Sequence, residues 1–289
     1  MSALDILCIG ECIVEFAPLA GDQEAFRRRF IGDSLATAEA LARLGHRVGF
    51  ATRIGTDAIS REMGAFIAAQ GISPDWITTD PSRSVGVCAI SPGAGMDRLS
   101  SWRDQSAARL LARDPVWLAR ALAAAPELYL TGMTLAILER DRDREQLLDA
   151  LARARAGGAR IVLAPHLCPE VWRDQSQMCR WISRAARGAD LVLTSAEDEI
   201  RAFGDASTEA VLARYQGHRV REIVLRCDAG PVVGWQAGRS EVSCASAPSN
   251  LDPSRDRFNA GYLAARTEGN DMLAALAAGV RLAEEALPD

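Results

Sequence analysis

Residues 34–53 read SLATAEALARLGHRVGFATR and place a helix directly before a strand. Leucines and alanines recur three and four residues apart between residues 35 and 42, so they share one face of a helix. Residues 48–53 then form a short apolar run of strand length, and residues 4–10, LDILCIG, form a similar run before the helix. Strand, helix and strand in this order predict two parallel strands joined by a crossover helix.

The same alternation continues to the end of the chain. Further helices are predicted at residues 57–70, 114–124, 141–156, 169–185 and 207–215, and further strands at residues 127–130, 160–164, 190–194 and 222–226. A hairpin is predicted at residues 231–236 and 241–244, followed by helices at residues 257–268 and 271–286. The pattern indicates an α/β fold with a doubly wound, mostly parallel sheet. We expect residues 1–289 to form one domain, because no long linker interrupts the alternation.

Two segments, near residues 12–18 and 84–102, contain short strands without a crossover helix between them. Their strands are joined by turns that contain glycine and proline, such as residues 92–95. Strands joined by short turns pair in antiparallel fashion. We therefore expect a small antiparallel sheet that projects from the main sheet and acts as a lid.

The composition narrows the class of protein. The chain has 33 basic and 38 acidic side chains, a net charge of −5, and this balance argues against nucleic-acid binding. Its apolar runs are far shorter than the roughly 20 residues that cross a bilayer, so we expect no membrane contact. Seven cysteines occur without a CxxC pair, which is typical of reduced thiols. Together these features predict a cytoplasmic protein.

Several motifs follow one another along the chain. They are Gly10-Glu11, Gly32-Asp33, Gly55-Thr56-Asp57, WRDQSAAR at residues 102–109, YLTGMTLAIL at residues 129–138 and FNAGYLAAR at residues 258–266. In this order and spacing the chain resembles the ribokinase (PfkB) family of carbohydrate kinases, and in particular its 2-keto-3-deoxygluconate kinases. The resemblance spans essentially the whole chain. It implies a ribokinase-like three-layer α/β/α sandwich with a small β-sheet lid, and a homodimer formed through the lid.

The resemblance also implies ATP-dependent phosphoryl transfer, with Mg²⁺, to a hydroxyl of a sugar or a 2-keto-3-deoxy sugar acid. In the family, an aspartate after a Gly-Ala-Gly turn takes the hydroxyl proton, and backbone N–H groups hold the transferring phosphate. Asp256 matches this base, but Pro253, Ser254 and Arg255 replace the glycine-rich turn. Pro253 removes one N–H donor, and the Arg255 guanidinium is a candidate replacement for it. The alternative is that Asp256 caps the following helix and Arg255 is a solvated side chain.

The substrate motifs of the family are matched in part. Gly32 and Asp33 retain two of its substrate-binding positions. The resemblance places Arg103 against a substrate carboxylate, and Trp102 beside it is a candidate for lining the sugar pocket. A second carboxylate-binding arginine of the family corresponds to Cys168 in this chain. Half of a charged clamp binds an anion less tightly than a pair of arginines.

The nucleotide-binding loop of the family corresponds to RCDAGP at residues 226–231. The resemblance assigns Arg226, Asp228 and Gly230 to nucleotide binding, and Asp228 brings a negative charge close to the expected phosphates. Glu199 matches an acidic residue that organises Mg²⁺ beside the nucleotide in the family. The alternative is that the acidic run at residues 197–199 is the first turn of a helix, where the helix dipole favours negative charge.

Two functions stay open at this level. The first is an ATP-dependent sugar kinase in which Asp256 acts as the base and Arg255 holds the phosphate. The second is a non-catalytic homologue that keeps the fold and acts as a binding or partner protein, because the site motifs depart from the family at several positions. We expect a small-molecule sugar or sugar acid as ligand and no nucleic-acid or membrane partner.

Overall fold

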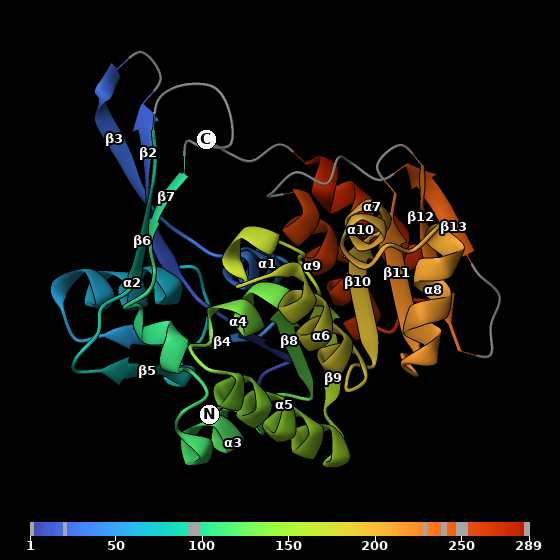
Figure 1. Cartoon of the computed structure of the whole chain (residues 1–289), viewed down its shortest axis with the longest axis horizontal. Coiled ribbons are helices and arrows are strands. Elements are labelled where there is room, and N and C mark those ends of the chain that lie inside the picture. The colour runs from blue at the N-terminus through green and yellow to red at the C-terminus, as the bar shows by residue number, and fades with distance from the viewer. Residues whose placement is uncertain are drawn as a thin grey trace.

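Two β-sheets organise the fold (Figure 1). The computed structural model describes residues 3–19, 22–91, 99–227, 230–237, 242–246 and 254–285. Within these residues the larger sheet has nine strands in the order β13-β12-β11-β10-β9-β8-β1-β4-β5. They are β1 (Ile6–Ile9), β4 (Val48–Gly55), β5 (Ile77–Asp80), β8 (Glu127–Thr131), β9 (Arg160–Ala164), β10 (Leu191–Ser195), β11 (Glu222–Arg226), β12 (Pro231–Gln236) and β13 (Val242–Ser246). Neighbours from β5 to β11 run parallel, as predicted, and β12 and β13 add the predicted antiparallel hairpin at one edge.

Helices cover both faces of this sheet. They are α1 (Asp33–Arg43), α2 (Ala58–Ala69), α3 (Pro115–Leu122), α4 (Gly132–Ile137), α5 (Asp141–Ala156), α6 (Gln175–Ala186), α7 (Ala196–Phe203), α8 (Thr208–Gly217), α9 (Ser254–Thr267) and α10 (Met272–Glu284), with short 3₁₀ turns η1 (Pro74–Trp76), η3 (Ala107–Leu110) and η4 (Pro169–Val171). Buried residues of α3 to α8 form one core, and those of α1, α2, α9 and α10 form the other. Among the described helices, none has both the length and the apolar character that a bilayer span requires.

Alternate residues of the same strand pack into the two different cores. In β1, Leu7 and Ile9 belong to the core beneath α3 to α8, whereas Ile6 and Cys8 belong to the core beneath α1 and α9. Successive side chains of a strand point to opposite faces, so a strand buried on both sides reads as a continuous apolar run. This arrangement confirms the three-layer α/β/α sandwich. That residues 1–289 form a single domain stays a prediction.

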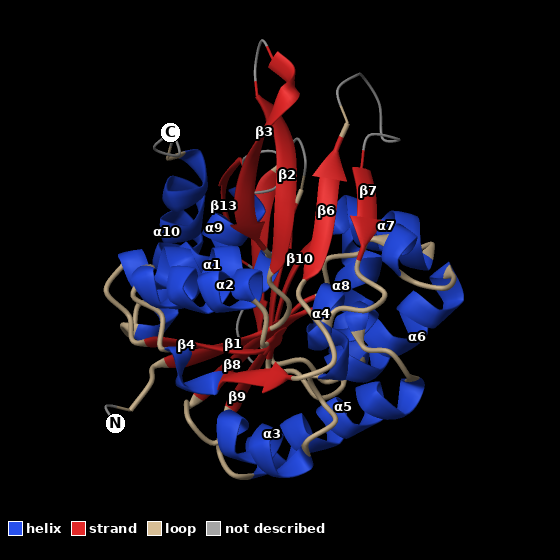
Figure 2. Cartoon of the chain, turned by 90° about the vertical axis from the view of Figure 1, so that its left-hand side faces the viewer, coloured by secondary structure: helices blue, strands red, loops and turns tan. Residues whose placement is uncertain are grey.

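The second sheet is the lid. Its strands, in the order β3-β2-β6-β7, are β2 (Ile13–Leu19), β3 (Asp22–Ile31), β6 (Gly86–Ile90) and β7 (Leu99–Trp102). The β2·β3 and β6·β7 pairs are antiparallel, but β2 and β6 run parallel with Ile13 opposite Gly86, so the prediction of a wholly antiparallel lid is wrong. The reason is that β2 and β6 both continue outward after parallel strands of the main sheet, β1 and β5. Figure 2 shows the lid strands standing above β1, β4 and β8.

Strand β3 was not predicted from the sequence. Its three consecutive arginines at residues 27–29 conceal the alternation that marks a strand. In the structure, the Arg28 guanidinium lies 5.2 Å from the centre of the Phe30 ring, and Arg29 donates to Glu15 of β2 at 2.8 Å. Cation–π and ion-pair contacts thus allow this basic segment to pair as an edge strand.

The helix predicted at residues 169–185 is divided in two. A single 3₁₀ turn, η4, comes first, and α6 begins only after Asp174. The Asp174 carboxylate accepts a hydrogen bond from the backbone N–H of Gln177 at 2.7 Å, which caps α6. Buried Trp172 lies between the two segments in extended conformation and packs into the core. Residues 165–168, directly after β9, are also free of helix, and candidate site residues lie there.

Candidate active site

The carboxyl ends of β1, β8, β9 and β11 meet the N-termini of α1 and α9, which is where open α/β sheets bind ligands. Buried hydrogen bonds hold this meeting point together: Thr37 Oγ1 of α1 donates to the Tyr129 hydroxyl of β8 at 3.2 Å, and Asn259 Nδ2 of α9 donates to the same oxygen at 3.0 Å. Burial raises the pKa of Tyr129, and the charges of Asp256 and Asp33 raise it further. The charges of two acidic residues that are distant in the sequence therefore act on one buried hydroxyl.

Asp33 opens helix α1 and pairs with a histidine. Its Oδ2 lies 2.9 Å from His166 Nδ1, and its Oδ1 accepts the Ser34 backbone N–H at 2.7 Å. Burial by itself would raise the pKa of Asp33, but the hydrogen bond and the charge of His166 outweigh burial and hold that pKa well below its usual range. Gly32, directly before Asp33, allows the start of α1 to pack closely against the backbone of Glu11, because a Cβ at residue 32 would lie 2.3 Å from the Glu11 carbonyl oxygen. Asp33 is thus a fixed, ionised acceptor at this site.

His166 was not predicted as a site residue. It follows β9 directly after Pro165 and has a φ of 40°, a left-handed backbone conformation that is uncommon for residues with a side chain. Backbone strain of this kind costs on the order of 1–3 kcal/mol and concentrates at functional sites. The signal in the sequence was its place at the carboxyl end of a central strand.

Asp256 lies inside helix α9 rather than before it. The helix begins at Ser254, so the alternative in which Asp256 caps a helix that follows it is wrong. Arg255 Nε lies 3.3 Å from Asp256 Oδ1, and only 11% of the Arg255 side chain and 5% of the Asp256 side chain are exposed. The alternative of a solvated Arg255 is therefore also wrong. Fully buried Phe258 anchors this first turn in the core. The role of Asp256 as a base stays a prediction.

Arg226 ends strand β11 and lies beneath the first turn of α9. Its Nη1 donates to Asn259 Oδ1 at 3.0 Å and to the Arg255 carbonyl at 3.4 Å, and both acceptors are neutral. Burial lowers the pKa of Arg226 to about 10, and the charge of Arg255 acts in the same direction. In the described part of the chain its buried Nε has no hydrogen-bond partner. The charge of Asp256 acts against this fall in the pKa, so a carboxylate offsets part of the cost of burying the cation.

This arrangement fits a polyphosphate ligand. Two guanidinium groups, Arg226 and Arg255, lie at the N-terminus of a helix of 14 residues, whose partial positive charge also favours anions. Gly230 lies in the turn before β12 and donates its N–H to the Cys227 carbonyl at 3.3 Å. Asp228, also predicted to contact the nucleotide, lies outside the described residues.

Glu199 does not fit the magnesium role that the sequence suggested. It is fully buried, and its Oε1 accepts hydrogen bonds from Thr194 Oγ1 at 2.7 Å and the Tyr215 hydroxyl at 2.6 Å. Its Oε2 accepts from Arg214 at 2.7 Å. Both oxygens are thus engaged by the protein, and the described residues hold no cluster of three potential metal ligands. The alternative is confirmed: α7 begins at Ala196 with residues 197–199 in its first turn.

Arg103 already has a carboxylate partner. Its Nε and Nη2 donate to Glu11 Oε2 at 2.9 and 2.5 Å, and Ser106 Oγ donates to Glu11 Oε1 at 2.5 Å. Glu11 follows β1 and is 4% exposed, so it ties the base of the lid to the main sheet. Sequence reasoning missed Glu11, because 92 residues separate it from Arg103. Trp102 ends lid strand β7 and is 62% exposed, so its side chain lies outside the core. Its role in lining the sugar pocket stays a prediction.

Cys168 follows β9 and has an acidic partner. Its thiol donates to the Glu170 carboxylate at 3.2 Å, and burial raises its pKa to about 11. The charge of Arg103 acts against this rise. Where the family resemblance expects a second arginine, the chain therefore presents a neutral thiol and an adjacent carboxylate.

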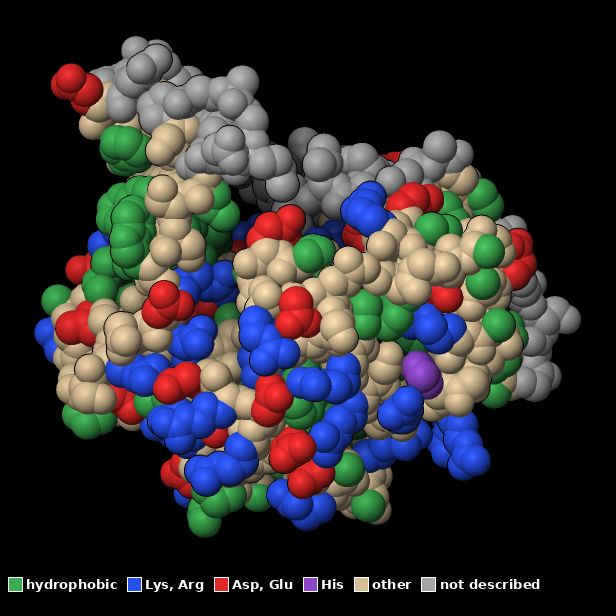
Figure 3. All heavy atoms as spheres, in the orientation of Figure 1, with side chains coloured by type: hydrophobic (Ala, Val, Ile, Leu, Met, Phe, Trp, Pro, Cys, Tyr) green, Lys and Arg blue, Asp and Glu red, His purple; other side chains and the backbone are tan. Residues whose placement is uncertain are grey.

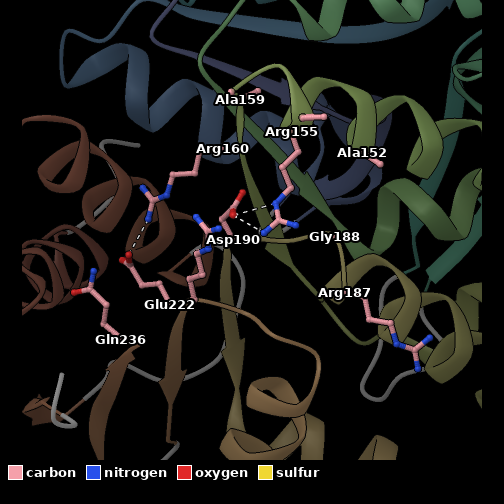
Figure 4. Close-up of a pocket in the computed structure, with 12 residues that line it drawn as sticks. Ala152, Arg155, Ala159, Arg160, Arg187, Gly188, Asp190, Glu222 and Gln236 are labelled. Carbon is pink, nitrogen blue, oxygen red and sulfur yellow. Dashed lines mark hydrogen bonds and ion pairs between the residues drawn. The ribbon is translucent and has the colours of Figure 1, made fainter. Parts of the chain in front are cut away.

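A separate hollow lies at another part of the sheet. It has a volume of about 720 Å³ and opens at the amino ends of β9 to β11, where Arg155 pairs with Asp190 and Arg160 pairs with Glu222 (Figure 4). Both carboxylates are satisfied by these pairs and by other donors, including the Tyr262 hydroxyl. This hollow lies at the amino ends of the strands, whereas Asp33 and Asp256 lie at their carboxyl ends. It is therefore not part of the candidate active site.

Comparisons with known proteins agree with this geometry. A sequence model described as pfkB family carbohydrate kinase matches residues 3–287. The 2-dehydro-3-deoxygluconokinase of Dickeya dadantii is 29% identical over 93% of this chain and 90% of its own length. The protein of the same name from Escherichia coli K12 is 27% identical over 91% of this chain and 88% of its own length.

Solved structures share the fold. A PfkB protein from Polaromonas sp. JS666 superposes with a TM-score of 0.82 and 27% identity, over 97% of this chain and 95% of that one. A fructokinase from Xylella fastidiosa, solved with bound ATP, superposes with a TM-score of 0.78 over 97% of this chain and 86% of that one. At 21% identity the second likeness concerns the fold alone.

Proposed function

The chain belongs to the pfkB family of carbohydrate kinases, and we propose that it transfers the terminal phosphoryl group of ATP to a hydroxyl of a sugar or a 2-keto-3-deoxy sugar acid. The names of its curated relatives support this activity. The observation that carries the proposal is the first turn of α9, where buried Asp256 lies beside Arg255 and above Arg226. A proton acceptor and two cations are thereby held by two adjoining elements, α9 and β11, at the end of the sheet where ligands bind.

The residues have distinct tasks in this reaction. The Asp256 carboxylate accepts the proton of the acceptor hydroxyl while that oxygen bonds to the terminal phosphorus and the bond to the leaving phosphate oxygen breaks. Arg255 and Arg226 neutralise the charge on the phosphate oxygens, which is the main task of a protein in phosphoryl transfer. Asp33 accepts hydrogen bonds from substrate hydroxyls and orients the sugar. ATP supplies the phosphoryl group, and Mg²⁺ enters with the nucleotide phosphates rather than at Glu199.

An assay of ADP release over a panel of sugars and sugar acids tests the proposal. We expect turnover with at least one acceptor and a loss of about 10²- to 10⁴-fold in kcat for Asp256→Asn, because a general base contributes that much. Glu209→Gln, on the exposed side of α8, is the matched control and leaves kcat unchanged. Absence of turnover, together with no rise in Tm on adding millimolar ATP, would favour the non-catalytic homologue, which the comparisons do not support.

We also propose that the protein is a homodimer formed through the lid. Four large exposed apolar side chains, Leu19, Phe26, Leu99 and Trp102, lie on the lid strands. Figure 3 shows hydrophobic side chains gathered on the lid, whereas charged groups cover the helices below it. Exposed apolar groups on a sheet with open edge strands favour pairing with a second copy. Light scattering should give twice the chain mass for the native protein and the monomer mass for Trp102→Glu with Leu99→Glu.

A further inference from the structure

We infer that Glu222 is a positioning residue for the proposed phosphoryl transfer, although it lies at the end of the sheet opposite the candidate active site. The inference rests on the proposed kinase function, because it concerns how the first turn of α9 is held in place. It is carried by a buried charge cluster at the amino end of β11, in which Glu222 binds Tyr262 and Arg266 of α9.

The Glu222 carboxylate accepts three hydrogen bonds from α9. Its Oε1 accepts from the Tyr262 hydroxyl at 2.5 Å and from Arg266 Nε at 3.0 Å, and its Oε2 accepts from Arg266 Nη2 at 3.0 Å. Arg266 thus binds both oxygens as a fork, which makes charge-assisted hydrogen bonds strong and directional. Arg160 of β9 also donates to Oε2 at 3.0 Å, so the carboxylate is bound to the sheet as well as to the helix (Figure 4). Only 6% of the Glu222 side chain is exposed, and water therefore competes little for these contacts.

A second set of contacts joins the same strand and helix at the candidate active site. Arg226, the last residue of β11, donates to the Arg255 carbonyl and to Asn259 Oδ1 of α9. Glu222 and Arg226 are four residues apart, about 13 Å along a strand, and Arg255 and Tyr262 are seven residues apart, about 10 Å along a helix. The strand and the helix are therefore joined at two points, one at each end of β11.

Apolar packing alone fixes the position of α9 along its axis less sharply than these bonds do. The attraction between apolar side chains such as Phe258 and Leu263 is non-directional, and packed helices slide past one another in many conformational changes. The hydrogen bonds of Glu222 tolerate less movement, because a contact of about 3.6 Å is no longer a hydrogen bond. A misplacement of about 1 Å, even one that arises far from the chemistry, can lower a rate about 10²-fold. Glu222 therefore acts on Asp256 and Arg255 through the helix.

The cluster is better suited to positioning than to stability. Burying charged groups costs desolvation free energy that their attraction only partly offsets, so apolar groups of similar size often stabilise a fold equally well. Asp190 at the same edge offers a comparison, because its carboxylate pairs with Arg155 of α5, a helix that carries no candidate site residue. The two carboxylates differ in the helix that they hold, not in the kind of contact that they make.

Steady-state kinetics of Glu222→Gln, with Asp190→Asn as the matched control, tests the inference. We expect Glu222→Gln to lower kcat about 10- to 100-fold and to change the KM for the sugar by less than about threefold, whereas Asp190→Asn keeps the native kcat. Melting curves establish that each variant is folded at the assay temperature. A folded Glu222→Gln protein with the native kcat, or an equal loss of kcat in both variants, would overturn the inference. If the native protein itself shows no turnover, it is the kinase proposal that fails.

Two further measurements decide the matter if Glu222→Gln does not fold or no acceptor is found. Tyr262→Phe removes one of the three bonds from α9 without altering the charge, and it should lower kcat about 3- to 10-fold. Hydrogen exchange needs no substrate: Tyr262→Phe should speed the exchange of the backbone amides of residues 258–261, and Asp190→Asn should not. The native kcat in folded Tyr262→Phe, or native exchange rates where no acceptor is turned over, would overturn the inference.

Discussion

The Asp33–His166 pair gives the most quantitative prediction. The two groups approach to 2.9 Å, with 8% of the Asp33 side chain and 16% of the His166 side chain exposed. Asp33 is ionised and can only accept, so His166 Nδ1 donates to it, and a hydrogen bond to a charged group contributes roughly 1.5–3 kcal/mol. Removing the imidazole leaves the buried carboxylate without this donor, so we expect His166→Ala to lower the free energy of unfolding by about 1.5–3 kcal/mol.

Urea unfolding followed by tryptophan fluorescence measures this change, and a double-mutant cycle assigns it to the pair. We expect Asp33→Asn to be costly as well, and the combined variant to lose less than the sum of the single losses, by about 0.5–3 kcal/mol. Additive losses, or a loss below about 1 kcal/mol for His166→Ala, would refute the argument that the pair holds the site together.

The pair also predicts a pH dependence. Because the folded-state pKa of Asp33 lies below the unfolded value of about 3.9, its contribution is complete above that pH and is lost as the pH falls through the folded pKa. The difference in unfolding free energy between the native protein and Asp33→Asn should therefore shrink as the pH is lowered from about 5 to 3. A difference that is constant across this range would contradict the lowered pKa.

Three further predictions follow from single residues. Arg226→Met should raise the KM for ATP about 10- to 100-fold, because a hydrogen bond to a charged group contributes roughly 1.5–3 kcal/mol; an unchanged KM in steady-state kinetics would remove Arg226 from the nucleotide site. Glu199→Gln should lower the unfolding free energy by about 1–3 kcal/mol, since Arg214 loses its charged partner, while the Mg²⁺ concentration for half-maximal activity stays constant; a tenfold rise in that concentration would restore the metal role. Leu7→Ala, in the core beneath α3 to α8, should cost about 2–5 kcal/mol in urea unfolding without changing either KM, and a smaller loss would mean that β1 is not fully buried.

The architecture was largely predictable because it depends on local patterns. Residues 141–156, 160–164 and 222–226 were predicted with the bounds that the structure has, since their periodicity or unbroken apolar character is unambiguous. Strand β3 was missed because arginines occupy successive positions of both faces. The parallel β2·β6 pair was missed because pairing direction depends on how the segments leave the main sheet.

The candidate site was predictable only where a motif carries it. Gly32, Asp33 and Asp256 were identified from family motifs, and the structure brings the backbones of the two aspartates to the same side chain, Thr37, whose hydroxyl lies 3.3 Å from the Asp33 carbonyl and 3.5 Å from the Asp256 carbonyl. Which partner each charged group selects was not predictable, because His166 lies 133 residues from Asp33 and no local pattern records that contact. The same holds for Glu199. Arg214 and Tyr215 of α8 both donate to its carboxylate, so it forms a structural ion pair instead of binding a metal, and the sequence does not record these contacts.

The strand order of the two sheets has a consequence for folding during synthesis. Strand β1 pairs with β8, where Ile6 lies opposite Glu127, and lid strand β2 pairs with β6, where Ile13 lies opposite Gly86. Both partners are therefore synthesised long after the strand with which they pair. The N-terminal strands therefore leave the ribosome with unpaired edges and must wait for partners made much later. Pairings between such distant segments slow folding and expose the nascent chain to aggregation. Chaperone dependence in this protein should accordingly be concentrated in its first half, before β8 emerges.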